Sequence, residues 1–478
     1  MHPPTNSGDN GESQGEIAKL KINKPLNSFP TNIFNLADSL KHLDLSGTGL
    51  SALPEDFGCL WKLKIAFFSN CNFTVFPRQL ASCPELEMVA FRSNSMVEVP
   101  EDTLPPKLRW LILTNNRIRS VPRSIGRCWR LQKCMLAGNQ LQCLPDEMVA
   151  CRKLALLRLS ANRIRELPDW LFNLPELAFL SFAGNLCCSS PATSKDPRDT
   201  IPFSILPEAS WEDLDIHNVL GEGASGIISK GSWNGIDQVQ EVAIKLFKGD
   251  VTSDGTPADE MEACIRAGSH SNLINPLAKI TGHPDGKEGL VMQLIPPRYH
   301  VLGLPPSLQT CTRDCFSREI RLTTRQGLEI LYGIARAAGH LHKRGVAHGD
   351  LYAHNILYSG DEDEQEEEGG HALLGDFGAA SIYTNSSLNY IYDDNDDNDD
   401  DSKNKFEWLE VLAFAHLLED VWGITKPRFD EEELRVAMLL VALHRQCLNP
   451  TGSQRPSFNE ISRQLSAMKQ RLTSTTTQ

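Results

Sequence analysis

The residues best suited to chemistry lie in the second half of the chain and begin with three glycines. Gly221, Gly223 and Gly226 form a G-x-G-x-x-G pattern after the strand-like run 214–220. Glycine at these positions lets a backbone loop approach phosphate oxygens with no side chain between them. The pattern alone also fits dinucleotide-binding folds and ordinary turns. A dinucleotide-binding fold needs a helix directly after the glycines, whereas the run 227–233 is typical of a strand.

Four further motifs follow these glycines in a fixed order. They are VAIK ending at Lys245, HGDLYAHN beginning at His348, DFG beginning at Asp376, and CLNPTGSQRPSF at 447–458. Each by itself has an ordinary reading as a turn or a surface loop, but all five in order do not. The set resembles the motifs of eukaryotic-type protein kinases, in the tyrosine-kinase-like group, with HGD in place of HRD. The resemblance covers residues 212–472.

This resemblance implies an α+β bilobal protein kinase fold that uses ATP and Mg²⁺. In such a fold Lys245 holds the α- and β-phosphates, and Asp350 accepts the proton of the substrate hydroxyl. Asn355 and Asp376 would bind the metal ion. Phosphoryl transfer depends on positioning and charge neutralisation, so the presence of all four residues supports an active kinase.

Lys245 needs a carboxylate partner to fix its position. The helix-like stretch 260–272 resembles the kinase C-helix and offers Glu260 and Glu262. Glu262 is favoured because its distance along the chain to His270 is nearer that of the family.

The run 290–295 resembles the strand and hinge that receive adenine, with Met292 at the gatekeeper position. The residues that the resemblance assigns to ATP are Gly221, Gly223, Gly226, Ile228, Ala243, Lys245, Met292, Leu294 and Leu357.

The catalytic loop departs from the family pattern at three positions. Gly349 replaces an arginine that pairs with a phosphorylated activation segment, so this domain should need no such phosphate. Tyr352 stands where Ser/Thr kinases have a lysine near the γ-phosphate. His354 lies where tyrosine kinases often have an arginine, and a partial replacement by His354 would make the rate sensitive to pH. A purely structural role for His354 is an equal alternative.

The segment after Asp376 is also reduced. The A-P-E motif of the family is absent, and the next long helix is expected to begin at Glu410, 34 positions on (410 − 376). The ledge that receives a protein substrate is therefore shortened. Arg455 loses the glutamate with which it normally pairs.

The first half of the chain repeats with a period near 23 residues. The segment 108–122 fits L-x-x-L-x-L-x-x-N-x-L-x-x-L-P. The closing prolines, spaced by 23 residues with one gap of 22, are Pro54, Pro77, Pro100, Pro122, Pro145, Pro168 and Pro191. One unit is too small to bury its own apolar residues, so neighbours stack and share a core. The pattern resembles cytosolic leucine-rich-repeat domains, which predicts an α/β solenoid over 20–192 with a degenerate cap ending at Pro30.

The repeat frame assigns three sets of residues. In one repeat the inward set is Leu154, Leu157, Leu159, Ile164 and Leu167. A ladder of amides that can satisfy backbone groups comprises Asn94, Asn116, Asn139, Asn162 and Asn185, with Thr48 and Cys71 in the first two repeats. The outward set on the concave face predicts a protein-binding patch of Ile65, Phe67, Met88, Trp110, Ile112, Met135 and Phe179. The alternative is that a kinase lobe or inter-repeat packing covers these side chains.

The formal net charge of −14 has a local source. Residues 361–368 and 393–401 hold seven acids each and no base, so these runs account for all of it. The neutral remainder has no basic stripe, which argues against nucleic acid as the main partner. The runs are interpreted as solvated inserts; a preference for basic substrates, or autoinhibition, is the alternative.

The sequence also predicts where in the cell the protein is located. The first sixteen residues are polar and lack the apolar core of a signal peptide. No apolar run approaches the roughly 20 residues that span a membrane. The thirteen cysteines are odd in number and scattered, which predicts reduced thiols. We expect a cytoplasmic protein without a membrane span.

The sequence thus predicts a disordered N-terminus, a solenoid, a linker, a kinase domain and a tail. Their bounds are 1–19, 20–192, 193–211, 212–472 and 473–478. The expected function is an ATP- and Mg²⁺-dependent protein kinase, with Ser/Thr hydroxyls as acceptors and the solenoid as protein-recognition module in signalling. Two alternatives stay open: a pseudokinase scaffold, and a small-molecule kinase of the aminoglycoside or choline type.

Overall fold

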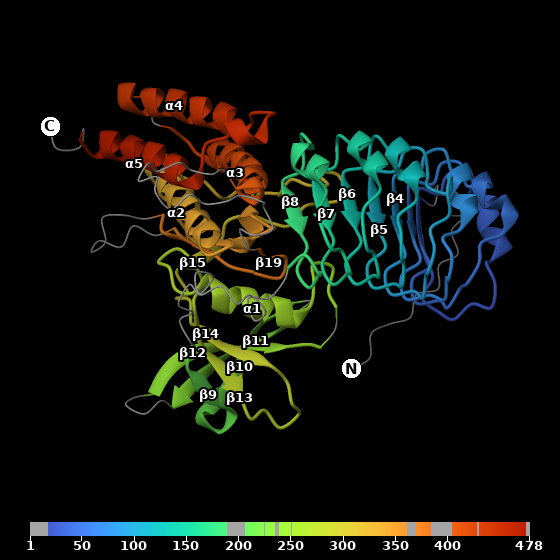
Figure 1. The fold of residues 1–478 in the computed structure, drawn as a ribbon, viewed down its shortest axis with the longest axis horizontal. Coiled ribbons are helices and arrows are strands. Elements are labelled where there is room, and N and C mark those ends of the chain that lie inside the picture. The colour runs from blue at the N-terminus through green and yellow to red at the C-terminus, as the bar shows by residue number, and fades with distance from the viewer. Residues whose placement is uncertain are drawn as a thin grey trace, which may run out of the picture.

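The computed structural model describes residues 18–188, 206–223, 225–234, 239–249, 251–360, 370–383, 404–427 and 430–474 (Figure 1). Both acidic inserts lie outside these residues. So do most of the predicted N-terminal segment, most of the linker 193–211 and the end of the tail.

The first half of the chain folds as a solenoid around one parallel sheet in the order β1 to β8. Each strand has three residues. The strands are β1 (Lys19–Lys21), β2 (His42–Asp44), β3 (Ile65–Phe67), β4 (Met88–Ala90), β5 (Trp110–Ile112), β6 (Lys133–Met135), β7 (Leu156–Arg158) and β8 (Phe179–Ser181). In-register pairing runs through the sheet, and Leu111, for example, lies between Val89 and Cys134.

Short 3-10 helices form the outer side of the solenoid. They are η1 (Thr31–Leu36), η2 (Glu55–Cys59), η3 (Arg78–Ser82), η4 (Arg123–Arg127), η5 (Asp146–Ala150) and η6 (Asp169–Asn173). A proline precedes each of them, as Pro122 does at φ −65° before η4. The fixed φ of proline suits the residue that starts a helical turn, which explains why the repeat closes on this residue.

The predicted core and ladder of the solenoid are confirmed. Leu154, Leu157 and Leu159 are fully buried. Asn139 donates from Nδ2 to the carbonyl oxygens of Leu113 and Leu136 at 3.0 and 2.9 Å, and its Oδ1 accepts the amide of Ile118 at 3.0 Å. The side chain therefore satisfies buried backbone groups of two neighbouring repeats, as expected of such a ladder.

The second half forms two lobes. The N lobe is built on a six-stranded sheet in the order β10-β11-β12-β14-β13-β9. Its elements are β9 (Glu208–Ser210), η9 (Trp211–Asp213), β10 (Leu214–Glu222), β11 (Gly226–Asn234), β12 (Val239–Phe247), α1 (Pro257–Ala267), β13 (Pro276–Thr281) and β14 (Gly289–Gln293). β9 pairs with β13, so residues of the predicted linker belong to this sheet. The strand β11 directly after Gly226 confirms that no helix opens there.

The C lobe is mainly helical. Its helices are α2 (Thr324–Lys343), α3 (Lys405–Ile424), α4 (Glu431–Cys447) and α5 (Phe458–Ser474), with the short turns η10 (Ala353–Asn355) and η12 (Gly452–Gln454). Its strands are β15 (Tyr299–Val301), β16 (Val346–Ala347), β17 (Ile356–Ser359), β18 (Ala372–Leu374) and β19 (Ser381–Ile382). The prediction that α3 begins at Glu410 is wrong by more than one turn. Asn404 caps the helix by accepting the amide of Phe406 at 3.0 Å, so α3 starts at Lys405.

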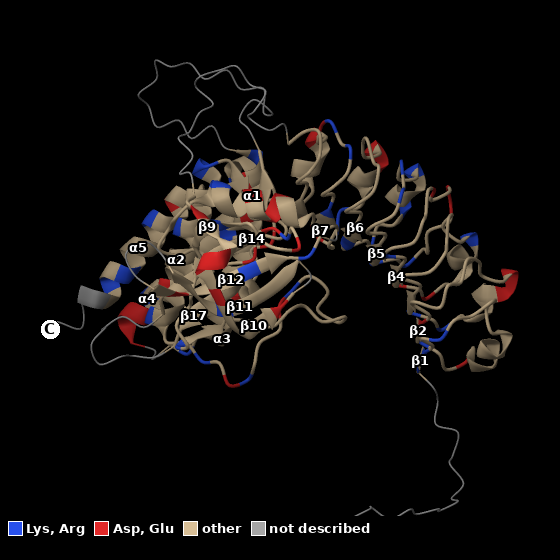
Figure 2. Ribbon diagram, turned by 90° about the horizontal axis from the view of Figure 1, so that it is seen from below, with Lys and Arg blue, Asp and Glu red and all other residues tan. Residues whose placement is uncertain are grey.

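The solenoid and the two-lobed domain share their hydrophobic cores. Leu156 and Phe179 of the solenoid belong to the core cluster of the C lobe. Conversely, Tyr383, Phe406 and Leu409 belong to the core cluster of the solenoid. Figures 1 and 2 show the β7–β8 end of the solenoid arc lying against both lobes. The two halves therefore form one packed unit.

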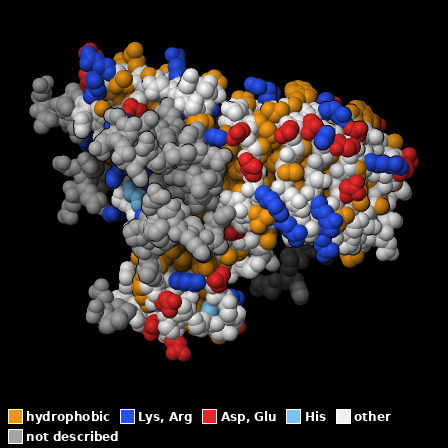
Figure 3. All heavy atoms as spheres, in the orientation of Figure 1, with side chains coloured by type: hydrophobic (Ala, Val, Ile, Leu, Met, Phe, Trp, Pro, Cys, Tyr) orange, Lys and Arg blue, Asp and Glu red, His pale blue; other side chains and the backbone are white. Residues whose placement is uncertain are grey.

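Three smaller findings concern the described residues. All thirteen cysteines fall among the described residues and are free. No helix in the described part of the chain is long and apolar enough to cross a membrane. Over the solenoid face seen in Figure 3, basic and acidic side chains are interspersed, so neither sign of charge dominates that face.

Candidate active site

The glycine-rich turn joins β10 and β11. Gly221 pairs with Ile228 across this hairpin. A Cβ added at Gly221 or Gly223 would meet no atom of the described residues within 4 Å, whereas one at Gly226 would lie 2.6 Å from the carbonyl oxygen of Leu246. Packing thus explains only the last glycine. The first two leave open space above the backbone, which fits a loop that lies over phosphate groups.

Lys245 lies on β12 and forms an ion pair with Glu260 of α1. Both side chains are shielded, with 14% and 1% of their surface exposed. Burial lowers the pKa of Lys245, but Glu260 outweighs it and raises that pKa above its ordinary value. Thr256 caps α1 by accepting the amide of Asp259 at 3.2 Å, and this cap fixes the helix that carries Glu260.

The prediction of Glu262 as the partner of Lys245 is wrong. Residues two apart on an α-helix point to nearly opposite sides, and Glu262 is exposed to solvent. Spacing along the sequence to His270 could not choose between the two glutamates, because the direction in which α1 faces is set by its packing. The missed signal is the apolar face of the helix, since Met261 and Cys264 are buried on the side of Glu260.

The predicted adenine-site residues lie on neighbouring strands. Ala243 pairs with Met292 across β12 and β14, and Ile228 pairs with Lys245 across β11 and β12. Because side chains directly opposite on paired strands share a face, Ile228, Ala243 and Lys245 line one side of the sheet. Leu294 and Leu357 are half-buried beyond the end of β14 and on β17. Their role toward adenine stays a prediction.

The catalytic loop is held from two sides. His348 is fully buried, and its Nε2 lies 2.9 Å from the carbonyl oxygen of Gly375. Asn355 donates from Nδ2 to the backbone oxygen of Asp350 at 2.9 Å and to its Oδ2 at 3.1 Å. Glu410 accepts the amide of Gly349 at 2.5 Å. The loop thus presents Asp350 and Asn355 together, as the motif predicts.

Asp376 begins the segment that faces this loop. It has a positive φ of 55°, is exposed, and accepts the amide of Gly378 at 3.1 Å through Oδ1. Phe377 is buried against the ring of His348, 5.3 Å between centroids. No group of three or more His, Cys, Asp or Glu side chains in the described residues has the geometry to hold a metal ion.

The donors at this point still suit Mg²⁺. Asn355 and Asp376 offer one amide and one carboxylate. Mg²⁺ is commonly bound by one or two protein oxygens together with phosphate oxygens and water. When bound, the ion would neutralise charge on the phosphates. Both residues remain predicted ligands.

His354 is paired with a carboxylate. Its Nδ1 lies 2.8 Å from Oδ1 of Asp314, and its backbone amide donates to Oδ2 of the same residue at 3.0 Å. Burial lowers the pKa of His354, but Asp314 raises it above its ordinary value overall. The pairing supplies the structural role that the sequence left open. A role toward the γ-phosphate stays a prediction.

One functional-site residue that the sequence did not indicate is Arg158 of β7. Its Nη2 donates to Oδ1 of Asp350 at 2.5 Å, and its Nη1 donates to the carbonyl oxygen of Gly349 at 2.8 Å. Its Nε lies 2.8 Å from Oδ1 of Asp254, which belongs to the loop before α1. Only 3% of the arginine side chain is exposed. The sequence did contain one signal for this residue: Arg158 is a charged side chain at an outward strand position, beside repeats that have apolar side chains there.

The charges around Asp350 favour its ionised form. Burial by itself would raise the pKa of the Asp350 carboxyl, and the Arg158 guanidinium outweighs this and holds that pKa below its usual range. Burial raises the pKa of Asp254. A carboxylate that stays ionised is the form that can accept a proton.

The predicted protein-binding patch is partly covered by the chain itself. Phe179 is buried and stacks on Tyr352, with centroids 3.9 Å apart and planes 10° apart. Met135 packs against the C-lobe core. Phe67 and Trp110, nearer the N-terminus, remain half-exposed. The kinase-lobe alternative therefore holds for the β6–β8 end of the concave face. Met88 on β4 is also buried, with 7% of its surface exposed, so its prediction as an exposed residue of the patch is wrong.

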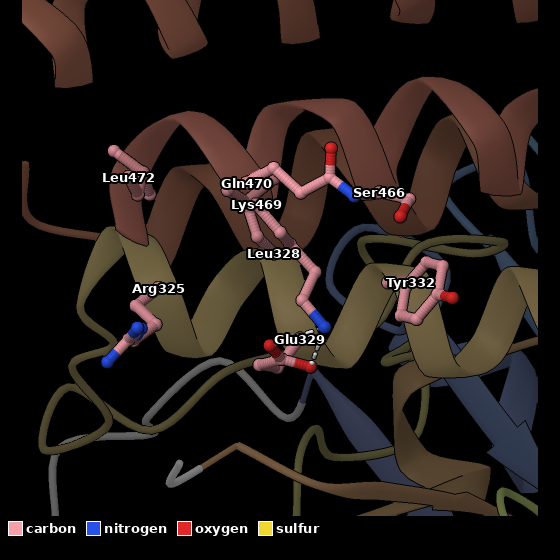
Figure 4. Close-up of a pocket in the computed structure, with 8 residues that line it drawn as sticks. All are labelled: Arg325, Leu328, Glu329, Tyr332, Ser466, Lys469, Gln470 and Leu472. Atoms are coloured by element: carbon pink, nitrogen blue, oxygen red, sulfur yellow. Dashed lines mark hydrogen bonds and ion pairs between the residues drawn. The ribbon is translucent and has the colours of Figure 1, made fainter. Parts of the chain in front are cut away.

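A separate groove of about 230 Å³ lies between α2 and α5 (Figure 4). It is lined by Arg325, Leu328, Glu329, Tyr332, Ser466, Lys469, Gln470 and Leu472. The ammonium group of Lys469 pairs with Glu329 at 2.6 Å and lies 4.4 Å from the ring centre of Tyr332. The groove includes none of the residues described above and belongs to the packing of these two helices.

Comparison with known families agrees with this geometry. Residues 214–424 match the family model described as protein tyrosine and serine/threonine kinase. The chain carries a protein kinase domain. Residues 39–60 match the leucine-rich-repeat model, so the solenoid in front of the kinase domain is a leucine-rich-repeat region.

Similar proteins include two proteins named as kinases and one named as a growth factor receptor. "Probable serine/threonine-protein kinase gdt2" of Dictyostelium discoideum is 23% identical over 53% of this chain and 16% of its own length. "Fibroblast growth factor receptor 1" of Pleurodeles waltl is 28% identical over 32% of this chain and 20% of its own length. "Ribosomal protein S6 kinase alpha-2" of Mus musculus is 30% identical over 31% of this chain and 18% of its own length. The chain thus spans about a fifth or less of each of these three relatives.

Proposed function

We propose that this chain is an ATP- and Mg²⁺-dependent protein kinase that phosphorylates Ser or Thr hydroxyls. The observation that carries the proposal is that two parts of the candidate site are already assembled. The Lys245–Glu260 ion pair is formed, and Asn355 contacts Asp350 in the catalytic loop. Phosphoryl transfer in kinases requires the lysine–glutamate pair to be in place.

In the proposed reaction the oxygen of the acceptor hydroxyl forms a bond to the γ-phosphorus. The bond between that phosphorus and the bridging oxygen to the β-phosphate breaks, and ADP leaves. Asp350 accepts the hydroxyl proton, and Lys245 orients the α- and β-phosphates. Mg²⁺ held by Asn355 and Asp376 would neutralise the phosphate charge.

The solenoid is proposed as the protein-recognition module. The part of its concave face that remains half-exposed includes Ile65, Phe67, Trp110 and Ile112 on β3 and β5. Apolar and aromatic side chains gathered on such a face are typical of protein-binding surfaces. This narrows the predicted patch to the end distant from the kinase domain.

The test uses the purified full chain with radiolabelled Mg·ATP and general protein substrates, followed by phosphoamino-acid analysis. We expect phosphoserine or phosphothreonine with the natural chain, and none with Asp350→Asn or Lys245→Met. Phosphotyrosine would contradict the proposed specificity. ATP binding without any transfer would contradict the kinase activity.

A pseudokinase scaffold is the second candidate, because Arg158 contacts the Asp350 carboxylate and Tyr352 replaces a lysine. In that case ATP would bind, Lys245→Met would abolish binding, and neither the natural chain nor the Asp350→Asn variant would label any substrate, aminoglycosides included. Transfer to aminoglycosides alone would instead support a small-molecule kinase.

A further inference from the structure

Arg158, which contacts the catalytic loop, belongs to a different domain from that loop. Arg158 is the last residue of β7 in the solenoid, 192 positions before Asp350 in the chain. Its guanidinium reaches Asp350 and Gly349 in the C lobe and Asp254 in the N lobe. One buried side chain therefore connects the solenoid, the catalytic loop and the segment that leads into α1.

The catalytic loop is shaped for this contact. Gly349 has a positive φ of 73°, and a Cβ at this position would lie 2.7 Å from the backbone oxygen of Leu180 in β8 and 2.6 Å from that of Ala379. Any larger residue there would push against the solenoid backbone, because such oxygens cannot move aside as a flexible side chain can. The glycine of HGD is thus required by the close approach of two backbone segments, one from the solenoid and one that follows the DFG motif.

The solenoid also holds the segments on either side of the active site. The backbone amides of Phe182 and Ala183 donate to Oγ of Ser381 at 2.9 and 3.1 Å, just after the DFG motif. In the N lobe, a Cβ at Gly255 would lie 3.1 Å from Cβ of Ser160. Asp259, in the first turn of α1, lies against Gly184. These contacts restrain the helix that carries Glu260.

The interface between the solenoid and the kinase domain resembles a protein core and not a contact that opens and closes. Phe182 of the solenoid and Tyr383 both stack on Phe406, with centroids 4.9 and 4.6 Å from its ring. Phe179 stacks on Tyr352, the residue that stands in place of the lysine. Interfaces that are apolar and share a core are typical of permanent association. The Lys245–Glu260 pair is formed while the solenoid is in place.

We propose that Arg158 is a positioning residue of the kinase site, supplied by the solenoid in place of the cation missing from the catalytic loop. One hydrogen bond to the Asp350 carboxylate and one to the Gly349 carbonyl oxygen fix the orientation of Asp350. The ion pair with Asp254 ties the catalytic loop to the N lobe. The solenoid is then a permanent part of the catalytic machinery as well as a recognition module. This inference rests on the proposed kinase function.

The first test is steady-state kinetics of the full chain with Arg158→Ala, Arg158→Lys and the control Arg163→Ala, an exposed arginine of the same repeat. We expect Arg158→Ala to lower kcat about tenfold to a hundredfold, since a displacement near 1 Å at a catalytic group has effects of that order. The KM for ATP should stay within about twofold, because Lys245 and the glycine loop are untouched. Arg163→Ala should match the natural chain.

The Arg158→Lys variant keeps the test valid if the Arg158→Ala variant does not fold. Lysine keeps the positive charge but lacks the planar fork that reaches three partners, so we expect a smaller fall in kcat with the same KM for ATP. Guanidinium chloride, well below denaturing concentrations, should partly restore kcat of Arg158→Ala, whereas equal sodium chloride should not. A merely structural arginine would not show this rescue.

Two results would overturn the inference. A rise in kcat of Arg158→Ala would mean that the arginine blocks the base, and an unchanged kcat would mean that it is structural only. Amide hydrogen exchange tests the positioning role of Arg158 independently of the proposed kinase function. If the natural chain transfers no phosphate, faster exchange at 348–355 in Arg158→Ala but not in Arg163→Ala still supports the positioning of the loop. Equal exchange in both variants contradicts it.

Discussion

At the scale of single residues, the kinase site depends on which of two similar side chains faces Lys245. Glu260 and Glu262 differ by two positions on one helix, yet 1% of the Glu260 side chain is exposed whereas Glu262 faces solvent. A turn of an α-helix has 3.6 residues, so two positions carry a side chain to the other side. The motif therefore locates the helix, and burial identifies the residue.

This difference leads to the first prediction. Glu260→Gln should lower kcat about tenfold to a hundredfold, because Lys245 loses the charge that holds it toward the phosphates. The Glu262→Gln variant is the matched control and should behave as the natural chain. Phosphate transfer at saturating ATP measures both. If Glu262→Gln were the more damaging of the two, the assignment of Glu260 would be wrong.

At the scale of elements, the catalytic loop depends on how α2 and α3 meet beneath it. His342 near the end of α2 and Glu410 in α3 form an ion pair of 2.8 Å, with 5% and 4% of their side chains exposed. Glu410 also accepts the amide of Gly349. This buried pair therefore links two helices to the residue that precedes Asp350.

The pair predicts a dependence of stability on pH. Burial lowers the pKa of His342, but Glu410 outweighs it and raises that pKa above 6.5. Its contribution to stability is complete below 6.5 and is lost as pH rises through the folded-state pKa. Burial raises the pKa of Glu410, but His342 lowers it below 4.5 overall, so its contribution is lost as pH falls through the folded-state pKa.

We therefore expect the contribution of this pair to the free energy of unfolding to fall as pH rises above about 6.5. Denaturant unfolding of the natural chain at several pH values measures it. Glu410→Gln should weaken the dependence, because the imidazolium loses its partner, whereas substitution of the exposed His217 by Asn should leave it unchanged. An equal slope in the Glu410→Gln variant would contradict the assignment.

At the scale of the whole molecule, the solenoid and kinase domain act as one folded unit. Phe406, in the first turn of α3, packs with Phe172 and Phe182 of the solenoid, with ring centroids 5.2 and 4.9 Å apart. It is 5% exposed. Because a solenoid passes stability between neighbours, a kinase domain packed on its last repeats can serve as the cap of that end.

We expect thermal unfolding of the full chain to show coupled melting of the two domains. Phe406→Ala should cost about 3–5 kcal/mol, the usual range for a buried aromatic residue, and should separate the transitions. Differential scanning calorimetry measures this. Substitution of the exposed Trp129 by Ala is the matched control and should leave the melting profile unchanged. Two well-separated transitions in the natural chain would contradict the shared core.

The sequence alone predicted both folds and indicated most residues of the candidate site. The solenoid follows from its repeat, because stacking of identical units leaves one way to bury leucines 154, 157 and 159. The kinase domain follows from five motifs in a fixed order. The glycine, lysine and carboxylate residues of these motifs lie at positions that the local strand or turn requires. Local pattern is sufficient there, because each motif carries its own strand or turn.

Tertiary structure alone decided how these parts meet. The direction of α1, which selects Glu260, depends on packing, and so does the start of α3 at Lys405. Arg158 lies 192 positions from Asp350, and no local pattern signals a contact over such a separation. The glycine of HGD reads in sequence as a lost arginine. In the folded chain it is the space through which the solenoid backbone approaches the catalytic loop.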